Sequence, residues 1–279
     1  MLTKNLNLIN QIFLRIIIKL FSSLTIGIAI SLCIFDVYTV FQLRNIGLIG
    51  INTSFSNLLF SLTQYSTYYI LWMPLIAFWM NGLVNIGPLE PLICVRSATQ
   101  NSYITSKIFS NMICAFAFSL WNFFAGILIF SHVRQVGADW HISCQYMESL
   151  GLFIVSGKFL HLPIIQLIFM QLFLHACSYF AIGLQIQLLY NLGCKSNFVL
   201  LVVMAKNFGL LLALKTCVLN PLNPVLPYRY LFLPFMDNIY DYFIAVIYWT
   251  IIILSFICAV YWTSIKWDVM NVYDEKSCC

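Results

Sequence analysis

A lysine and an asparagine stand side by side inside a long apolar stretch of the chain, at Lys206 and Asn207. A charge at the depth of a bilayer is costly, so such a residue usually faces a protein interior, a partner or a wet cavity. Lys206 and Asn207 are therefore candidates for a translocation path, and structural pairing of the lysine is the alternative. Lys215 lies nearer the end of the same stretch, where its long side chain can reach the headgroups.

A second polar group recurs within another apolar stretch, at Gln171, His175, Ser178 and Gln185. The spacing places these side chains on one face of a helix, which should turn toward other helices. This face could line a path, and helix association through hydrogen bonds is the alternative. We add Gln171, His175 and Ser178 to the candidate translocation path.

The sequence contains no constellation that is typical of catalysis. It has no CxxC pair, no HExxH and no Gly-x-Ser-x-Gly elbow. The nearest approach to a P-loop runs from Gly151 to Lys158, but it has the wrong spacing and ends in Phe159. We therefore predict no enzyme activity, no metal site, no cofactor and no nucleotide site of its own.

The composition of the chain indicates what kind of structural element carries these residues. Of the 279 residues, 62% are hydrophobic and only 8% are charged, about a third of the charge that soluble domains carry. Such a chain cannot cover itself with polar groups in water, which excludes a soluble enzyme and a nucleic-acid-binding domain. We predict a single all-α integral membrane domain over residues 1–279, surrounded by membrane lipids and without a nucleic-acid partner.

Six apolar stretches are long enough to cross a bilayer as helices. They cover residues 20–42, 65–86, 111–133, 163–190, 197–219 and 243–264. With the N-terminus in the cytoplasm, eight of the 14 lysines and arginines lie inside, four lie outside and two lie within a span. The positive-inside rule thus favours a multi-pass protein of the cell membrane with both termini cytoplasmic.

The first nineteen residues predict an amphipathic helix. Lys4, Asn7, Gln11, Arg15 and Lys19 recur every three or four residues, and apolar residues cover the rest. This pattern favours a helix lying in the cytoplasmic interface. A tilted extension of the first span is the alternative.

The predicted inner loop at residues 87–110 begins with Gly87, Pro88 and Pro91, which should end the second span. An apolar patch and Arg96 follow, and Ser106 and Lys107 lead into the third span. The loop suits contact with a cytosolic partner. An ordinary solvated loop with a topology-setting arginine is the alternative.

The stretch PLICVRSATQNSYITSKI within this loop resembles the segment between the second and third helices of ABC-2-type transporter permeases of Gram-positive bacteria. The matching positions are Arg96, Ser97, Tyr103, Ser106 and Lys107. Six spans, an amphipathic N-terminal helix and cytoplasmic termini are also similar to that family. The resemblance implies a permease that is driven by a separate ABC ATPase subunit and pairs with a second permease chain, in a homodimer or heterodimer. It implies that Glu90, Arg96, Tyr103 and Lys107 couple the chain to the ATPase.

The predicted outer segment at residues 220–242 contains four prolines and many apolar residues. The prolines forbid one continuous helix, so the segment should dip back toward the membrane. Short re-entrant helices stand at this place in ABC-2 permeases. An interfacial loop anchored by Tyr228, Tyr230 and Phe232 is an equal alternative.

These features together predict the permease subunit of an exporter for a hydrophobic or amphipathic substrate, such as a peptide antibiotic, a drug or a lipid. A non-transporting membrane scaffold or assembly factor is the first alternative. A secondary transporter is the second, although the chain lacks a clear internal repeat and carries one acid, Asp36, within a predicted span.

Overall fold

The computed structural model describes residues 72–84, 99–133, 162–215, 230–233, 236 and 238–266, and single positions 10, 12, 13, 16, 17, 27, 30, 34, 37 and 62. Five helices make up the continuous part, and no strand occurs in these ranges. They are α5 Met73–Val84, α7 Gln100–Val133, α9 Ile164–Asn191, α10 Ser196–Lys215 and α11 Ile239–Lys266. The predicted all-α fold is thereby confirmed for the described part of the chain.

Three of these helices contain segments that are long and apolar enough to cross a membrane. The segments are Gln100–Leu128, Ile165–Asn191 and Ile239–Ser264. α10 carries a shorter apolar segment, Ser196–Leu210, and α5 has 12 residues, which is about 18 Å at 1.5 Å per residue. Three predicted spans thus correspond to membrane-length helices, and the full number of six stays a prediction. Most of the N-terminal helix and of the first span lies outside the described residues.

The exposed surface of α11 indicates which solvent the bundle needs. In the most apolar window of α9, 89% of residues are buried, whereas in that of α11 only 17% are buried although its mean hydropathy is 2.6. The exposed positions of α11 include Phe243, Ile247, Ile251 and Leu254. A face this apolar is unfavourable in water and suits the hydrocarbon of a bilayer, which indicates a membrane protein.

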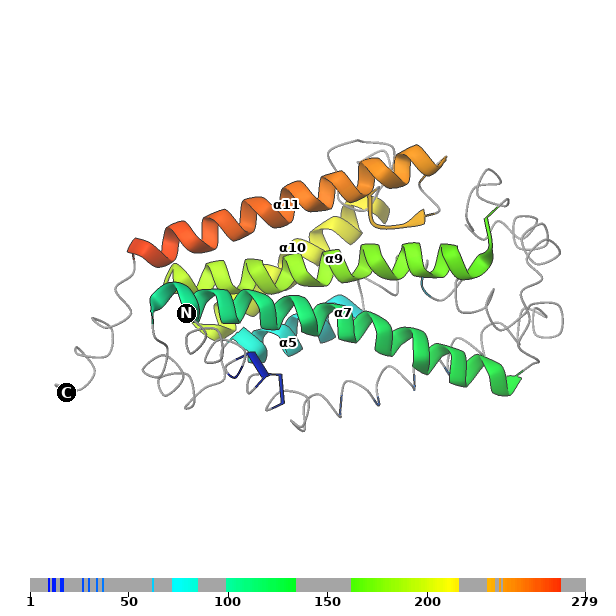
Figure 1. Ribbon diagram of the computed structural model, residues 1–279, viewed down its shortest axis with the longest axis horizontal. Coiled ribbons are helices and arrows are strands. Elements are labelled where there is room, and N and C mark those ends of the chain that lie inside the picture. The colour runs from blue at the N-terminus through cyan, green and yellow to red at the C-terminus, as the bar shows by residue number, and fades with distance from the viewer. Residues whose placement is uncertain are drawn as a thin grey trace.

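α9 forms the centre of the bundle, with contacts to all four other helices. In Figure 1 it runs between α11 and α7, α10 crosses behind it, and α5 lies behind α7. An aromatic chain joins three of the helices. The ring centroids of Trp79 (α5) and Phe118 (α7) are 5.4 Å apart, and those of Phe118 and Tyr179 (α9) are 5.7 Å apart. All three rings are buried, so they belong to the core.

α7 begins earlier than the sequence predicts, at Gln100 instead of residue 111. Residues 100–110 therefore belong to the helix and not to a loop. The Oγ1 atom of Thr99 accepts a 3.2 Å hydrogen bond from the N–H of Ser102, as an N-cap does. The hydroxyls of two serines donate to the helix's own carbonyls, Ser106 to Tyr103 and Ser110 to Ser106, at 2.7 Å each.

α11 also begins before its predicted start at residue 243. Asn238 and Asp241 form a capping box, in which the N–H of Asn238 donates to Oδ2 of Asp241 at 3.2 Å and the N–H of Asp241 donates to Oδ1 of Asn238 at 3.1 Å. Two helix donors are satisfied in this way. The last residues of the predicted 220–242 segment are consequently helical, from Ile239 onward.

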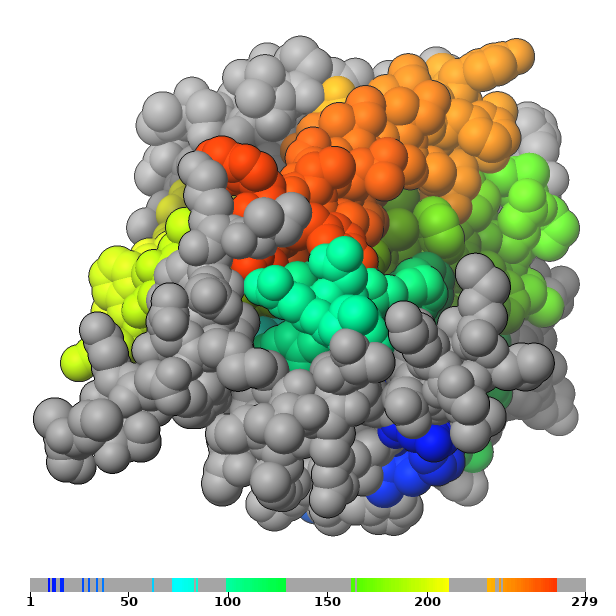
Figure 2. All heavy atoms as spheres, turned by 60° about the vertical axis from the view of Figure 1, so that its left-hand side comes forward, coloured from blue at the N-terminus to red at the C-terminus, as the bar shows by residue number. Residues whose placement is uncertain are grey.

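Polar side chains join all five helices at one end of the bundle, and we call this set the polar collar. It consists of Asn81, Gln100, Thr105, Tyr190, Asn191, Ser196, Tyr261, Thr263 and Ser264. The collar gathers the C-terminal ends of α5, α9 and α11 and the N-terminal ends of α7 and α10. Figure 2 shows the end of α11, in red, beside the start of α7, in teal. The helices therefore alternate in direction, as consecutive membrane crossings do.

The shortest collar contacts connect α7 and α9 to α11. Nε2 of Gln100 donates to the carbonyl of Ser264 at 2.6 Å, and Thr105 shares a 2.6 Å hydrogen bond with the hydroxyl of Tyr261. Nδ2 of Asn191 donates to Oγ of Ser264, also at 2.6 Å. The start of α7 and the end of α9 are therefore both bonded to the end of α11.

Candidate binding site between α5, α9, α10 and α11

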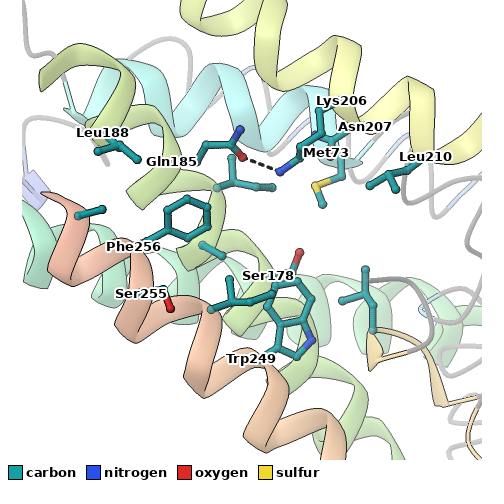
Figure 3. Close-up of a pocket in the computed structure, with 15 residues that line it drawn as sticks. Met73, Ser178, Gln185, Leu188, Lys206, Asn207, Leu210, Trp249, Ser255 and Phe256 are labelled. Atoms are coloured by element: carbon teal, nitrogen blue, oxygen red, sulfur yellow. Dashed lines mark hydrogen bonds between the residues drawn. The ribbon is translucent and has the colours of Figure 1, made fainter. Parts of the chain in front are cut away.

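A cavity of about 450 Å³ lies between four helices and the segment at residue 231. Its walls are mainly apolar, with Met73 from α5, Leu210 from α10, and Trp249 and Phe256 from α11. Its polar lining consists of Ser178, Gln185, Lys206, Asn207 and Ser255. Figure 3 shows these side chains converging from α9, α10 and α11. The cavity is therefore an apolar chamber with a small polar part.

Lys206 contributes the charge of this cavity. Its Nζ donates to Oε1 of Gln185 at 2.5 Å, drawn as the dashed line in Figure 3. Its neighbour Asn207 is buried, whereas Lys206 itself is exposed. Among the residues that the structure describes, Asp241 is the one acid, and its carboxylate caps α11. The hydrogen-bond partner of Lys206 is thus a neutral amide. Lys206 forms no ion pair with any residue that the structure describes.

The structure divides the predicted polar face of α9 between two places. Ser178 and Gln185 line the cavity with Lys206 and Asn207. Gln171 and His175 are buried beside it and do not line it. Three of the five candidates, Lys206, Asn207 and Ser178, are therefore brought together beside Gln185. The two others, Gln171 and His175, pack against the segment that precedes α11.

Gln171 holds the backbone of that segment. Its Nε2 donates to the carbonyl of Leu231 at 2.9 Å, and its Oε1 accepts from the N–H of Leu233 at 3.0 Å. The same Nε2 lies 2.9 Å from Nε2 of His175, whose ring meets Phe232 edge to face at 5.9 Å. One buried amide thus pairs with both a donor and an acceptor of the loop, as a neighbouring strand would.

Four residues of the predicted outer segment that precede α11 are buried against protein. Leu231, Phe232, Leu233 and Met236 are at most 2% exposed. Nε1 of Trp249 donates to the carbonyl of Tyr230 at 2.8 Å, and the rings of Tyr230 and Tyr248 stack at 4.4 Å. Phe232 is therefore a core residue and not an exposed interface anchor. Residues 220–229, including Tyr228, lie outside the described ranges, and the re-entrant course of the segment stays a prediction.

The predicted ATPase-coupling residues are placed only in part. Glu90 and Arg96 lie outside the described residues. Tyr103 and Lys107 lie one turn apart near the start of α7, with the lysine Nζ 4.8 Å from the centre of the tyrosine ring. Tyr103 is buried and Lys107 is half-buried, so the lysine is the more accessible of the two.

The contribution of α11 to the cavity was not predicted. Ile252, Ser255, Phe256 and Ala259 line one wall and recur at helical spacing. The signal available in the sequence was a serine at position 255 between apolar residues, on the same face as Phe256 and Ala259. The polar collar was missed for a different reason, because its members are scattered over five helices and pair only after folding.

No family model, curated protein or solved structure matches this chain. The residues that the structure describes contain no group of histidine, cysteine, aspartate and glutamate side chains that could hold a metal ion.

Proposed function

We propose that this chain is the permease subunit of an ATP-binding-cassette exporter in the cell membrane. The observation that carries the proposal is the cavity of about 450 Å³, which places a single lysine among apolar walls between four helices. Binding sites of this kind occur between the helices of bundles. The cavity suits a hydrophobic or amphipathic substrate, such as part of a peptide antibiotic, a drug or a lipid.

The energy source in this proposal is a separate ATPase subunit. The sequence has no P-loop to bind nucleotide phosphates. The inner loop that contains Glu90 and Arg96 leads directly into α7, and Tyr103 and Lys107 lie in the first turns of that helix. We place the ATPase on this loop, with both termini in the cytoplasm and a second permease chain completing the path.

The polar collar supports a mechanical route from the ATPase to the cavity. The start of α7 is bonded to the end of α11 through Gln100 and Thr105. Asn191 connects the end of α9 to the same part of α11. Both α9 and α11 line the cavity, so a displacement of the loop would reach the cavity walls. Nucleotide can drive this change only if it binds one of the two states more tightly.

Co-purification with an ABC ATPase subunit from the same organism tests the proposal. The tagged wild-type chain should retain the ATPase and change its rate of ATP hydrolysis. Arg96→Glu reverses the charge of the predicted docking loop and should reduce both readouts by about tenfold, as expected for breaking one charged contact at an interface. Arg134→Glu is the matched control, since Arg134 is predicted to lie on the outer side.

Two results would contradict the proposal. If Arg96→Glu left the complex and the ATP turnover unchanged, the docking assignment would be wrong. If the wild-type chain neither retained nor affected the ATPase, the exporter itself would be excluded in favour of a membrane scaffold. A chain that transports without any ATPase would instead indicate a secondary transporter.

A further inference from the structure

The cavity beside Lys206 has two chemically different ends. Lys206 and Gln185 form the polar end between α10 and α9, and their hydrogen bond is 2.5 Å long. Trp249 and Phe256 supply aromatic walls from α11 on the other side, as Figure 3 shows. A molecule that fills the cavity therefore meets a cation at one end and apolar surface at the other. This arrangement is complementary to an amphiphile.

The sign of the charge selects the class of amphiphile. Lys206 donates to the neutral amide of Gln185. Asp241, the one acid among the residues that the structure describes, caps α11. An acidic headgroup would replace the neutral amide with a carboxylate-type oxygen, so that both partners of the hydrogen bond carry opposite charges. A cationic headgroup would meet repulsion in surroundings where charges are weakly screened.

The size and position of the cavity restrict the ligand further. A volume of about 450 Å³ falls within the range of about 300–1,000 Å³ that is typical of small-molecule sites. It suits a single acyl chain with one headgroup better than a folded peptide. Lys206 and Ser255 are both exposed, so the cavity communicates with the surface of the bundle and can be filled from the surrounding bilayer.

We infer that this cavity binds an anionic single-chain amphiphile, with its acidic group on Lys206 and its chain against Trp249 and Phe256. The inference names a substrate class for the proposed exporter and rests on that proposal for its biological meaning. The binding itself requires only the permease chain, so it is tested without the ATPase.

The test uses dodecanoate brominated at its terminal carbon, which quenches tryptophan fluorescence when it lies beside Trp249. The purified chain is placed in nanodiscs of neutral phosphatidylcholine. We expect saturable quenching, and an apparent Kd for the methyl ester of the same acid that is at least about tenfold weaker, because the ester cannot form the charged contact. Trp249→Phe should remove most of the saturable signal.

Variants of the lysine determine whether it holds the acidic group. Lys206→Met should raise the Kd of the acid at least about tenfold and bring it to the value for the ester. Lys206→Arg keeps the charge and should bind within about threefold of the wild type. Lys195→Met is the control, because Lys195 is an exposed lysine that does not line the cavity.

A pair of tryptophan substitutions on α11 keeps the test decisive if Lys206→Met fails to fold. Ala259→Trp fills the cavity and should abolish binding, whereas Ile251→Trp adds the same bulk on the exposed side of the helix and should not. Equal affinity for the acid and the ester, or full binding by folded Lys206→Met, would overturn the inference. So would full binding by Ala259→Trp.

A last comparison distinguishes two sources of the anionic amphiphile. Nanodiscs that contain the single-chain anionic lipid lysophosphatidylglycerol should raise the apparent Kd of dodecanoate if a membrane lipid occupies the cavity, and leave it unchanged if free acids are preferred. Either result is consistent with an anionic amphiphile. Failure of binding together with normal stimulation of the ATPase would reject this inference and leave the exporter proposal intact. The reverse result would reject only the exporter.

Discussion

Gln171 shows how one side chain can fix a non-helical segment inside an apolar bundle. Backbone groups in such surroundings need partners, because water is absent and each unsatisfied group is costly. Gln171 carries both a donor and an acceptor, and it satisfies Leu231 and Leu233 together. An apolar residue of the same size would fill the space but leave both backbone groups without this partner.

We therefore expect Gln171→Leu to lower the free energy of unfolding by about 1–3 kcal/mol, the usual cost of losing a buried hydrogen-bond partner. The measurement is reversible unfolding of the purified chain by SDS titration in mixed micelles. Gln166→Leu is the control, because Gln166 lies on the same helix and is exposed. Equal stability of the two variants would show that the paired hydrogen bonds to the segment do not matter.

At the scale of the elements, the central position of α9 depends on close packing as well as on polar contacts. Gly183 lies where α9 approaches α7 and α5. A methyl group at this position would lie 3.3 Å from Cγ of Asn111 and 3.4 Å from Sδ of Met80. Small residues at such points let membrane helices approach one another closely. Gly183 therefore lies at a close contact of α9 with side chains of α7 and α5.

Replacing this glycine should separate the helices. We expect Gly183→Leu to destabilise the bundle by about 1–3 kcal/mol, the usual cost of overpacking, and to lower its thermal unfolding midpoint in detergent. Gly209→Leu on α10 is the matched control, because nothing lies within 4 Å of a methyl group there. If Gly209→Leu lowered the midpoint as much, close packing at Gly183 would not explain the result, since leucine favours a helix more than glycine does at both positions.

At the scale of the whole molecule, apolar side chains fill the core and also lie on the exposed surface of the helices. Leu254 is 55% exposed near the middle of α11, and Tyr240 is 74% exposed near its start. In a bilayer these two positions lie at different depths, although both are exposed. The proposed membrane setting therefore predicts that a charge is tolerated at one position and rejected at the other.

Leu254→Arg should reduce the amount of chain inserted into membranes, since an arginine at the helix centre costs about 2.5–3.5 kcal/mol on insertion scales. Tyr240→Arg should insert normally, because its side chain can reach the headgroups. The measurement is the ratio of membrane-integrated to carbonate-extractable protein. If both variants inserted equally well, α11 would not cross the bilayer in the proposed way.

The sequence predicts the starts of α9 and α10 more accurately than the starts of α7 and α11. α9 and α10 begin within one residue of their predicted starts at 163 and 197, because long apolar runs define them directly. The starts of α7 and α11 were predicted too late, since capping by Thr99, Asn238 and Asp241 and hydroxyl bonds within the helix admit polar residues that hydropathy assigns to loops.

The sequence by itself determined that the chain is a helical bundle for an apolar solvent, because composition and run length depend only on local chemistry. It also singled out Lys206, Asn207, Ser178 and Gln185 as polar residues inside apolar stretches. Only the tertiary structure decided that these four share one cavity while Gln171 and His175 hold the 231–233 segment. The physical reason is that helical spacing fixes which residues share a face, whereas packing with other helices fixes what each part of that face meets.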